Sequence, residues 1–542
     1  MGLESESTAE KTGFSKVKLW FTRNAKLLVV CFAVGMICHA QMYLNGLSNP
    51  DAVVSLSNPN GYGSFIPHAW DISLGRWGLL FAACAKFGLC SPILTSAITI
   101  ALFALGVVAL IDKLGIRNAC LQYASSILFI ASPFVSCCIT YYYCSNSYAL
   151  SFLCAVLAAC LIGRVGAVGK PVALVGAVAL LAFSLGCYQA SLGVFCVAVL
   201  LVMIRALMGG GSESLACDAR GEAQNSYREE GCSADSLSAK QLAVFFGVAV
   251  AVCAVGAVLY YALTELSLFA MGISLSTYGG ASSVGAGSIL GSLTSSVPSA
   301  YVAFSDGLFS HGILGNHFGW VYVATVGMII AAVAFVRLAA IGGVKRLGAS
   351  AMALLCVVLI PFAANVILVI VPSYGYPTLL MLGGFMASFL LLPLLVQLLL
   401  DSPDRGNVRL RMPAKAMSVG CCCLIAVGGV VVRAAVECGC RGYAGMPEPS
   451  CFFGHPNCRC ARRKPRCAGG REGADCRKTR GGKLSKHQRF LCSRKQLCEV
   501  GHGLGQPLPE QHAFLGRDNE AIRGSELQLL LIRRMRQGYS FQ

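Results

Sequence analysis

The chain has 542 residues, of which 56% are hydrophobic and 13% are charged, and its mean hydropathy is +0.67. A soluble globular domain carries about 25% charged residues, so the composition excludes that class and predicts an all-α polytopic membrane protein. The net charge of +18 does not indicate nucleic-acid binding, because most cationic residues lie in short loops beside apolar segments or near the C-terminus.

Windows of about 20 apolar residues can cross about 30 Å of hydrocarbon as helices, and they predict about 11 transmembrane helices. In chain order these windows are 25–44, 92–111, 118–138, 148–163, 171–186, 190–208, 241–262, 317–336, 350–371, 378–400 and 417–436. Together they define a multi-span membrane domain over residues 25–437. Its first window is longer than the apolar region of a cleaved signal peptide, so we expect an uncleaved signal anchor.

Lysine and arginine are distributed unequally between alternate loops. They gather in the N-terminal segment 1–24, in the short loops at 113–117 and 164–170, and in a linker at 209–240. The 263–316 loop has none. By the positive-inside rule the N-terminus is expected to be cytoplasmic. We expect the chain to lie in the cytoplasmic (inner) membrane. The segments expected to face outward are 45–91, 139–147, 263–316 and 372–377.

The first outward loop carries an unusual density of polar and aromatic side chains. Asp51 follows Asn-Pro just after the first span, where a carboxylate can act as a base, hold a cation, or simply cap a turn. Asp71 lies between Trp70 and the pair Arg76-Trp77, which suits sugar stacking and phosphate binding. The alternatives are an Asp71–Arg76 pair at a helix start and a snorkelling arginine. Residues 74–90 predict an interfacial amphipathic helix.

Three further segments contribute candidate residues. The tyrosine-rich run at 141–148 can line a polar pocket through Tyr142, Asn146 and Tyr148, or form an aromatic belt. Gln189 can bind substrate or make a helix–helix hydrogen bond. The Ser- and Gly-rich 263–316 segment is long enough for a lid or a substrate groove.

The sequence lacks the nucleotide-binding P-loop and a G-x-G-x-x-G after a strand, and it also lacks the zinc-binding H-E-x-x-H motif. This favours a donor that is already in the lipid phase. Four motifs then resemble the bacterial O-antigen glucosyltransferase (serotype-conversion) family, within the membrane glycosyltransferases that use polyprenyl-phosphate sugars. They are N-P-D at 49–51, W-D-x-S-L-G-R-W at 70–77, Y-Y-Y-x-x-N-S-Y-A-L-S at 141–151 and Y-Q-A at 188–190.

The resemblance implies a GT-C-like architecture with outward-facing catalytic loops. It implies a hexosyltransferase that moves glucose from a polyprenyl-phosphate donor to a surface glycan. Asp51 or Asp71 would be the general base, with Asp51 preferred, and Arg76 would hold the donor phosphate. Trp70, Trp77, Tyr142, Asn146, Tyr148 and Gln189 would contact substrate. Where an acid is expected near position 146 this chain has Asn, which leaves a second carboxylate to Glu265 or Asp306.

We expect no metal site and no cofactor, with a divalent cation as the alternative. The expected partners are the lipid-linked sugar, the glycan acceptor and the bilayer, and no nucleic acid. The main alternative function is a polytopic flippase or transporter of lipid-linked saccharides, which predicts charged residues in mid-span and internal repeats. Almost no such charges are found, and an inert scaffold is a third alternative.

The last 105 residues, 438–542, differ from the rest of the chain. They contain nine of the 28 cysteines and twenty Lys or Arg against eight acids. Their cysteine spacing is not that of a zinc site. We expect this basic tail to be disordered or to result from a shifted reading frame.

Overall fold

The computed structural model describes residues 3–47, 49, 69–84, 91–141, 143–165, 171–209, 239–276, 286–309, 318–342, 347–370 and 377–401. Within these residues every regular element is a helix. The C-terminal tail, most of the 209–240 linker and the last predicted span at 417–436 lie outside the described part.

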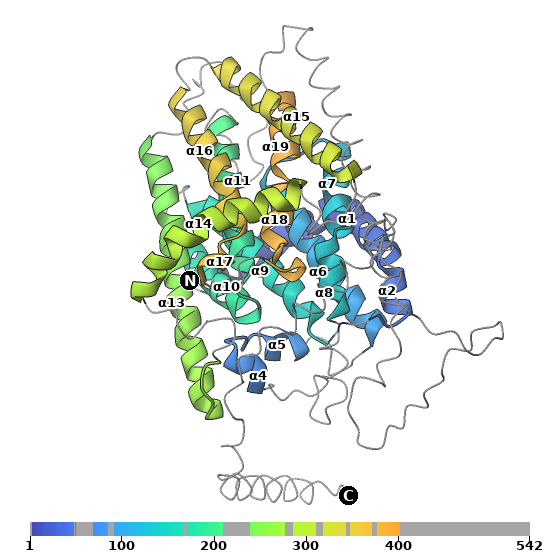
Figure 1. Cartoon of the computed structure of the whole chain (residues 1–542), viewed down its shortest axis with the longest axis vertical. Helices are drawn as coiled ribbons and strands as arrows, with labels where there is room; N and C mark the ends of the chain where they lie inside the picture. Colours follow the sequence, from blue (N-terminus) through green and yellow to red (C-terminus); the bar gives the residue numbers. More distant parts are fainter. Residues whose placement is uncertain are drawn as a thin grey trace, which may run out of the picture. The chain divides into compact units, whose positions relative to one another are not determined.

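Helices occupy every predicted apolar window that lies within the described residues, although the windows 118–138 and 378–400 each contain more than one helix and α14 lies outside all windows. Figure 1 shows their arrangement. They are α1 (Leu3–Cys38), α2 (Ala40–Leu44), α4 (Ala69–Ser73), α5 (Leu79–Cys84), α6 (Pro92–Lys113), α7 (Ala119–Ile130), α8 (Pro133–Thr140), α9 (Ser145–Val165), α10 (Pro171–Cys187), α11 (Ser191–Met208), α13 (Ala239–Met271), α14 (Ala286–Phe309), α15 (Phe318–Gly342), α16 (Leu347–Ala364), α17 (Ile367–Ile370), η4 (Leu379–Met381), α18 (Gly383–Ser388) and α19 (Leu391–Asp401).

Eight of the described helices are long and apolar enough to cross a membrane, and nine spans result if the bent pair α7–α8 is one of them. The pair bends by 40° where Ser132 and Pro133 begin a new helix. The bend is expected because proline cannot donate the hydrogen bond that would continue α7. With 17 residues, α10 is apolar but shorter than the eight candidate spans, each of which has at least 18 residues. The chain is therefore an all-α membrane protein in the part described.

Two segments differ from the sequence-based expectation. The predicted interfacial helix at 74–90 starts later than expected: residues 74–78 form a turn after α4, α5 covers Leu79–Cys84, and residues 85–90 lie outside the described part. The predicted 263–316 loop is largely helical, since α13 continues to Met271 and α14 occupies Ala286–Phe309. Its Ser- and Gly-rich composition concealed α14, which is held by tertiary hydrogen bonds. One runs from Ser296 Oγ to Leu368 O at 2.9 Å.

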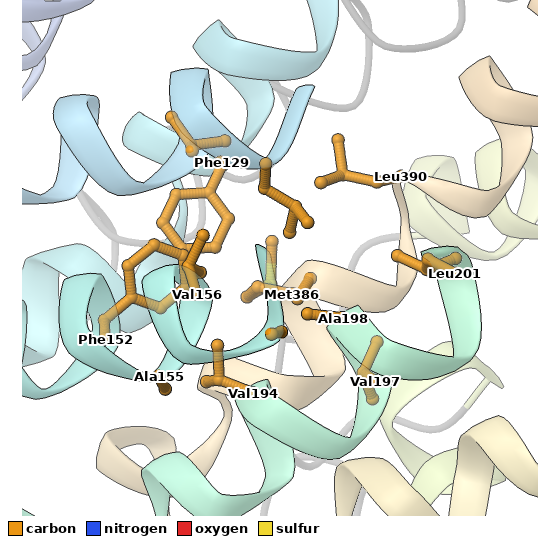
Figure 2. Packing of buried hydrophobic residues seen from close by; sticks show 14 of the residues in the cluster. Phe129, Phe152, Ala155, Val156, Val194, Val197, Ala198, Leu201, Met386 and Leu390 are labelled. Atoms are coloured by element: carbon orange, nitrogen blue, oxygen red, sulfur yellow. The ribbon is translucent and has the colours of Figure 1, made fainter. Parts of the chain in front are cut away.

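The core is a group of closely packed helices around α9, which contacts α6, α10 and α11, while α11 also contacts α16 and α18. Figure 2 shows Phe129 of α7 against Phe152 of α9, with ring centroids 4.7 Å apart, and Val194 of α11 in the same cluster. Since lipid is as apolar as these side chains, close packing stabilises the helix contacts more than water exclusion does.

Glycines allow several of these helices to approach at backbone distance. A Cβ atom at Gly193 of α11 would lie 2.7 Å from the carbonyl oxygen of Ala364 in α16. At Gly384 of α18 it would lie 2.8 Å from the carbonyl carbon of Gly193. Three helices thus meet where side chains are absent, as in small-residue contacts of membrane helices generally.

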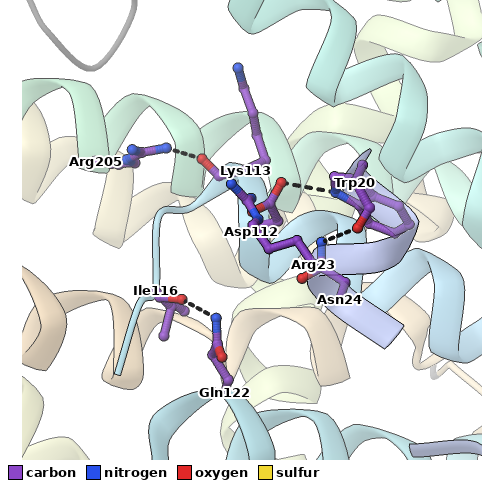
Figure 3. Close-up of polar contacts among 8 residues, drawn as sticks. All are labelled: Trp20, Arg23, Asn24, Asp112, Lys113, Ile116, Gln122 and Arg205. Atoms are coloured by element: carbon purple, nitrogen blue, oxygen red, sulfur yellow. Dashed lines mark hydrogen bonds and ion pairs between the residues drawn. The ribbon is translucent and has the colours of Figure 1, made fainter. Parts of the chain in front are cut away.

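The two ends of this helix group have different chemistry. At one end, the basic end, Asp112 of α6 accepts hydrogen bonds from Arg23 and from Trp20 Nε1, the latter at 3.0 Å, and Arg205 donates to the carbonyl of Lys113 (Figure 3). The opposite end begins where Thr99 of α6 and Ser145 of α9 hydrogen-bond at 2.9 Å. We call it the aromatic end, after Tyr141, Tyr143, Tyr148 and Tyr188.

We predict that Gly193→Ala destabilises the protein, because the added methyl group meets a backbone carbonyl that cannot move independently. Overpacking of this kind costs about 1–3 kcal/mol. The matched control is Gly247→Ala on α13, where a Cβ atom meets nothing within 4 Å. The midpoint of thermal unfolding in detergent, followed by size exclusion, checks this, and equal midpoints for the two variants would contradict it.

Candidate active site

A tight turn between α4 and α5 forms the centre of the aromatic end. The backbone N–H groups of Leu74 and Arg76 both donate to the Asp71 carbonyl, at 3.2 and 2.9 Å. Gly75 adopts φ +75°, a left-handed conformation in which glycine is unstrained. This turn interrupts the predicted 74–90 helix and places Arg76 at its exit.

The turn is packed directly onto the end of α10. The N–H of Gly78 donates to the carbonyl of Gly186 at 2.8 Å, and a Cβ atom on Gly78 would lie 2.7 Å from the amide nitrogen of Cys187. On the other side of the contact, a Cβ on Gly186 would lie 2.5 Å from the Trp77 indole. Trp77 also contacts Phe183 edge-on, with centroids 6.0 Å apart. Its Nε1 is buried without a hydrogen-bond partner among the described residues.

Arg76 places a partly buried cation at this contact. Its guanidinium carbon lies 5.4 Å from the centroid of the Tyr188 ring, within the range of a cation–π interaction. Burial alone lowers the pKa of Arg76, but Tyr148, Tyr188 and Asp71 raise it by more, so its net pKa lies above the usual value. The Nε atom is buried and has no hydrogen-bond partner within the described part of the chain. A partly desolvated cation with an unused donor is suited to bind an anion.

Asp71 and Trp70, neighbours in sequence, lie in different environments. Asp71 is 5% exposed and interacts electrostatically with Arg76 and with the Cys144 thiol. Trp70 is 47% exposed on α4. Asp71 thus lies close enough to influence the charge of Arg76, but the two residues do not start one helix, because Arg76 follows the turn after α4.

The start of α9 forms the wall beneath the turn. Asn146 is buried, and its Nδ2 donates to the Ala82 carbonyl of α5, while its Oδ1 finds no partner among the described groups. Tyr148 packs edge-on against Tyr188 with centroids 4.7 Å apart, and its hydroxyl accepts from the Cys144 thiol at 3.3 Å. Asn146 thereby joins α9 to α5, and Tyr148 supports the ring under Arg76.

Gln189, in the corner between α10 and α11, ties this corner to the turn. Its Nε2 donates to the Leu74 carbonyl at 2.7 Å and to the Tyr260 hydroxyl at 2.9 Å. The expected helix–helix hydrogen bond is therefore present, and it runs to the loop as well as to α13.

The structure brings together six of the nine candidate residues from the sequence. They are Asp71, Arg76, Trp77, Asn146, Tyr148 and Gln189. Asp51 and Tyr142 lie outside the described residues, and Trp70 is largely exposed. Glu265, an alternative carboxylate, is exposed on α13.

Sequence reasoning missed two residues of the site. Tyr188 was part of the Y-Q-A motif, and its position before Gln189 was the available signal. Tyr260 lies in an apolar span with no local pattern that marks it.

Comparison with known proteins identifies one family. Residues 62–388 match the model of the family described as Glucosyl transferase GtrII. No curated protein and no solved structure matches the chain significantly. The match includes the turn, the start of α9 and the α10–α11 corner. Among the described residues no group of three His, Cys, Asp or Glu side chains is arranged to hold a metal ion.

We predict that the Cys144 thiol is unreactive, because burial raises its pKa to about 12, and the Tyr148 hydrogen bond only partly opposes this. The thiolate is the reactive form, so labelling at pH 7.5 should be negligible and should not rise measurably by pH 9. Mass spectrometry after N-ethylmaleimide treatment of the folded protein checks this, with exposed Cys120 as the positive control. Equal labelling of both cysteines would show that the wall of the site is open.

Proposed function

The chain belongs to the GtrII glucosyl transferase family, and on that premise we propose that it transfers glucose from a polyprenyl-phosphate donor to a cell-surface glycan. The observation that carries the proposal is the partly buried guanidinium of Arg76, whose buried Nε has no hydrogen-bond partner among the described residues, at the end of a group of apolar helices. A polyprenyl tail partitions into the bilayer and places its phosphate at headgroup level, where such a cation can receive it.

We propose the following chemistry. A general base takes the proton of an acceptor hydroxyl, and the oxygen attacks the anomeric carbon of the donor sugar. The bond between that carbon and the phosphate oxygen breaks, and polyprenyl phosphate leaves with the bonding electrons. Arg76 stabilises the charge on the departing phosphate, because a cation held in place beside the leaving group favours the developing negative charge.

The two aspartates take different roles in the proposal. Asp71 is buried beside Arg76, which suits it to hold the guanidinium charge and orientation. The base is then Asp51, in the first outer loop at 45–91. Trp70, Trp77, Tyr142, Asn146, Tyr148 and Gln189 complete the donor and acceptor contacts, and the reaction as written needs no metal ion.

The same proposal includes the architecture and the orientation. We infer eleven spans in a GT-C-like arrangement, with 417–436 as the last. Arg23, Lys113 and Arg205 gather at the basic end, and Arg76 lies at the aromatic end. Under the positive-inside rule the basic end is cytoplasmic and the reaction takes place on the outer face of the cytoplasmic membrane.

The chemistry is tested in membranes supplied with radiolabelled polyprenyl-phosphate glucose. We predict transfer of label to polysaccharide by the wild type and a loss of about 10²–10⁴-fold in Asp51→Asn, since that is the contribution of a general base. Arg76→Gln should lose about 10²–10³-fold, the range for one donor to a developing anion.

The control is Asp401→Asn, at the end of α19, where the carboxylate accepts only a bond from Gln397 Nε2 at 3.0 Å among the contacts described. Full activity of Asp51→Asn would remove that residue from the mechanism. Movement of the labelled lipid across the bilayer without transfer to glycan would favour the flippase alternative.

The orientation has its own test. An epitope inserted between residues 55 and 65 should bind antibody on intact spheroplasts, and an epitope at the N-terminus should bind only after lysis. The reverse pattern would place the aromatic end in the cytoplasm.

A further inference from the structure

One face of α13 packs against the rest of the protein, and its composition changes along the helix. The protein-facing residues are Ala249, Val252, Gly256, Tyr260, Thr264 and Leu268. The outer face is apolar and exposed, for example at Val258, which is 69% exposed. The inner face is apolar except at Tyr260 and Thr264, and these two residues lie where α13 meets the turn that carries Arg76.

Tyr260 contacts the turn at its most constrained point. A Cβ atom on Gly75 would lie 2.4 Å from the Tyr260 hydroxyl and 3.4 Å from Thr264 Cγ2. Gly75 is also the residue with φ +75°. Substitution is therefore disfavoured twice, by the lack of space for a side chain and by the left-handed backbone conformation. The hydroxyl therefore lies directly against Gly75, the residue that precedes Arg76.

Gln189 joins Tyr260 to the Leu74–Gly75 peptide. One amide group, Gln189 Nε2, donates both to Leu74 O at 2.7 Å and to the Tyr260 hydroxyl at 2.9 Å. The Tyr260 hydroxyl thus fixes the rotation of the amide, which in turn fixes the Leu74–Gly75 peptide. Ser276, beyond the end of α13, adds a second attachment by donating its N–H to Ser73 O at 2.8 Å.

We propose that Tyr260 is a positioning residue for the sugar-transfer reaction. It acts through Gln189 and the 74–75 peptide to hold the Arg76 guanidinium over Tyr188, where the donor phosphate is received. The inference rests on the proposed function, because it takes Arg76 as the phosphate-binding group. Its new content is that α13, otherwise an apolar span, sets the geometry of the catalytic loop.

The hydroxyl group is the part of Tyr260 that matters. Tyr260→Phe keeps the ring and its packing but removes the acceptor, so one N–H of Gln189 loses its partner. A neutral hydrogen bond contributes about 0.5–1.5 kcal/mol, which corresponds to about a two- to tenfold change in an equilibrium constant. A loss of that size should fall on donor binding while the fold remains intact.

The experiment uses the full-length protein in detergent with farnesyl phosphate as inhibitor and farnesyl-phosphate glucose as donor. In Tyr260→Phe we expect the inhibition constant for farnesyl phosphate and the KM for the donor to rise about two- to tenfold. The KM for the acceptor and the thermal midpoint should not change. The matched control is Tyr322→Phe on α15, where the tyrosine is 70% exposed.

A double-mutant cycle with Arg76→Lys separates positioning from a merely structural effect. If Tyr260 acts through the guanidinium, Tyr260→Phe should have no further effect on farnesyl phosphate inhibition once Arg76 is Lys. Equal effects in both backgrounds would overturn the inference, as would a Tyr260→Phe variant that matches Tyr322→Phe. A wild-type enzyme that transfers glucose but is not inhibited by farnesyl phosphate would overturn the lipid-phosphate donor itself, and this inference with it.

Discussion

The close approach of two backbones, at Gly78 and Gly186, is the constraint on which the aromatic end depends. The hydrogen bond of 2.8 Å between them places the 74–78 turn directly on the end of α10, with no side chain between. Arg76 and Trp77 precede this contact in the chain, so their side chains must lie over Tyr188 and Gly186. A larger residue at either glycine would lift the turn and remove the cation from its ring.

The charged groups at the two ends of the helix group differ in their exposure to solvent. At the basic end, Asp112 pairs with Arg23, which is 64% exposed at its side chain, so solvent shares in stabilising the charges. At the aromatic end, Arg76 is partly buried and interacts with Tyr148, Tyr188 and Asp71. An isolated buried cation is costly, and its cost is offset here by the tyrosine ring, the nearby carboxylate and, under the proposed function, the donor phosphate.

Different helices contribute different groups to the aromatic end. The start of α9 supplies a wall, the α10–α11 corner supplies the ring and the amide, and α13 supplies the hydroxyl that orients the amide. These contacts restrain the site, because the Gln189 amide and the Asn146 Nδ2 group each hydrogen-bond to another element. Glycosyl transfer benefits from this restraint, since charge stabilisation is largest when the dipoles are already in place.

The sequence by itself determined the all-α membrane class, the family and most of the helix positions, because hydropathy and length are local properties. It also singled out Arg76, Asn146 and Gln189, since polar residues beside apolar spans are unusual. It did not predict α14, whose Ser-rich stretch is held by contacts with residues some seventy positions away, as from Ser296 to Leu368. Only the tertiary structure brought Tyr260 to Gly75 across about 180 residues of chain. That contact depends on which face of α13 meets the turn, and such a choice is made by packing over long sequence separations, which leaves no periodic signal in the chain.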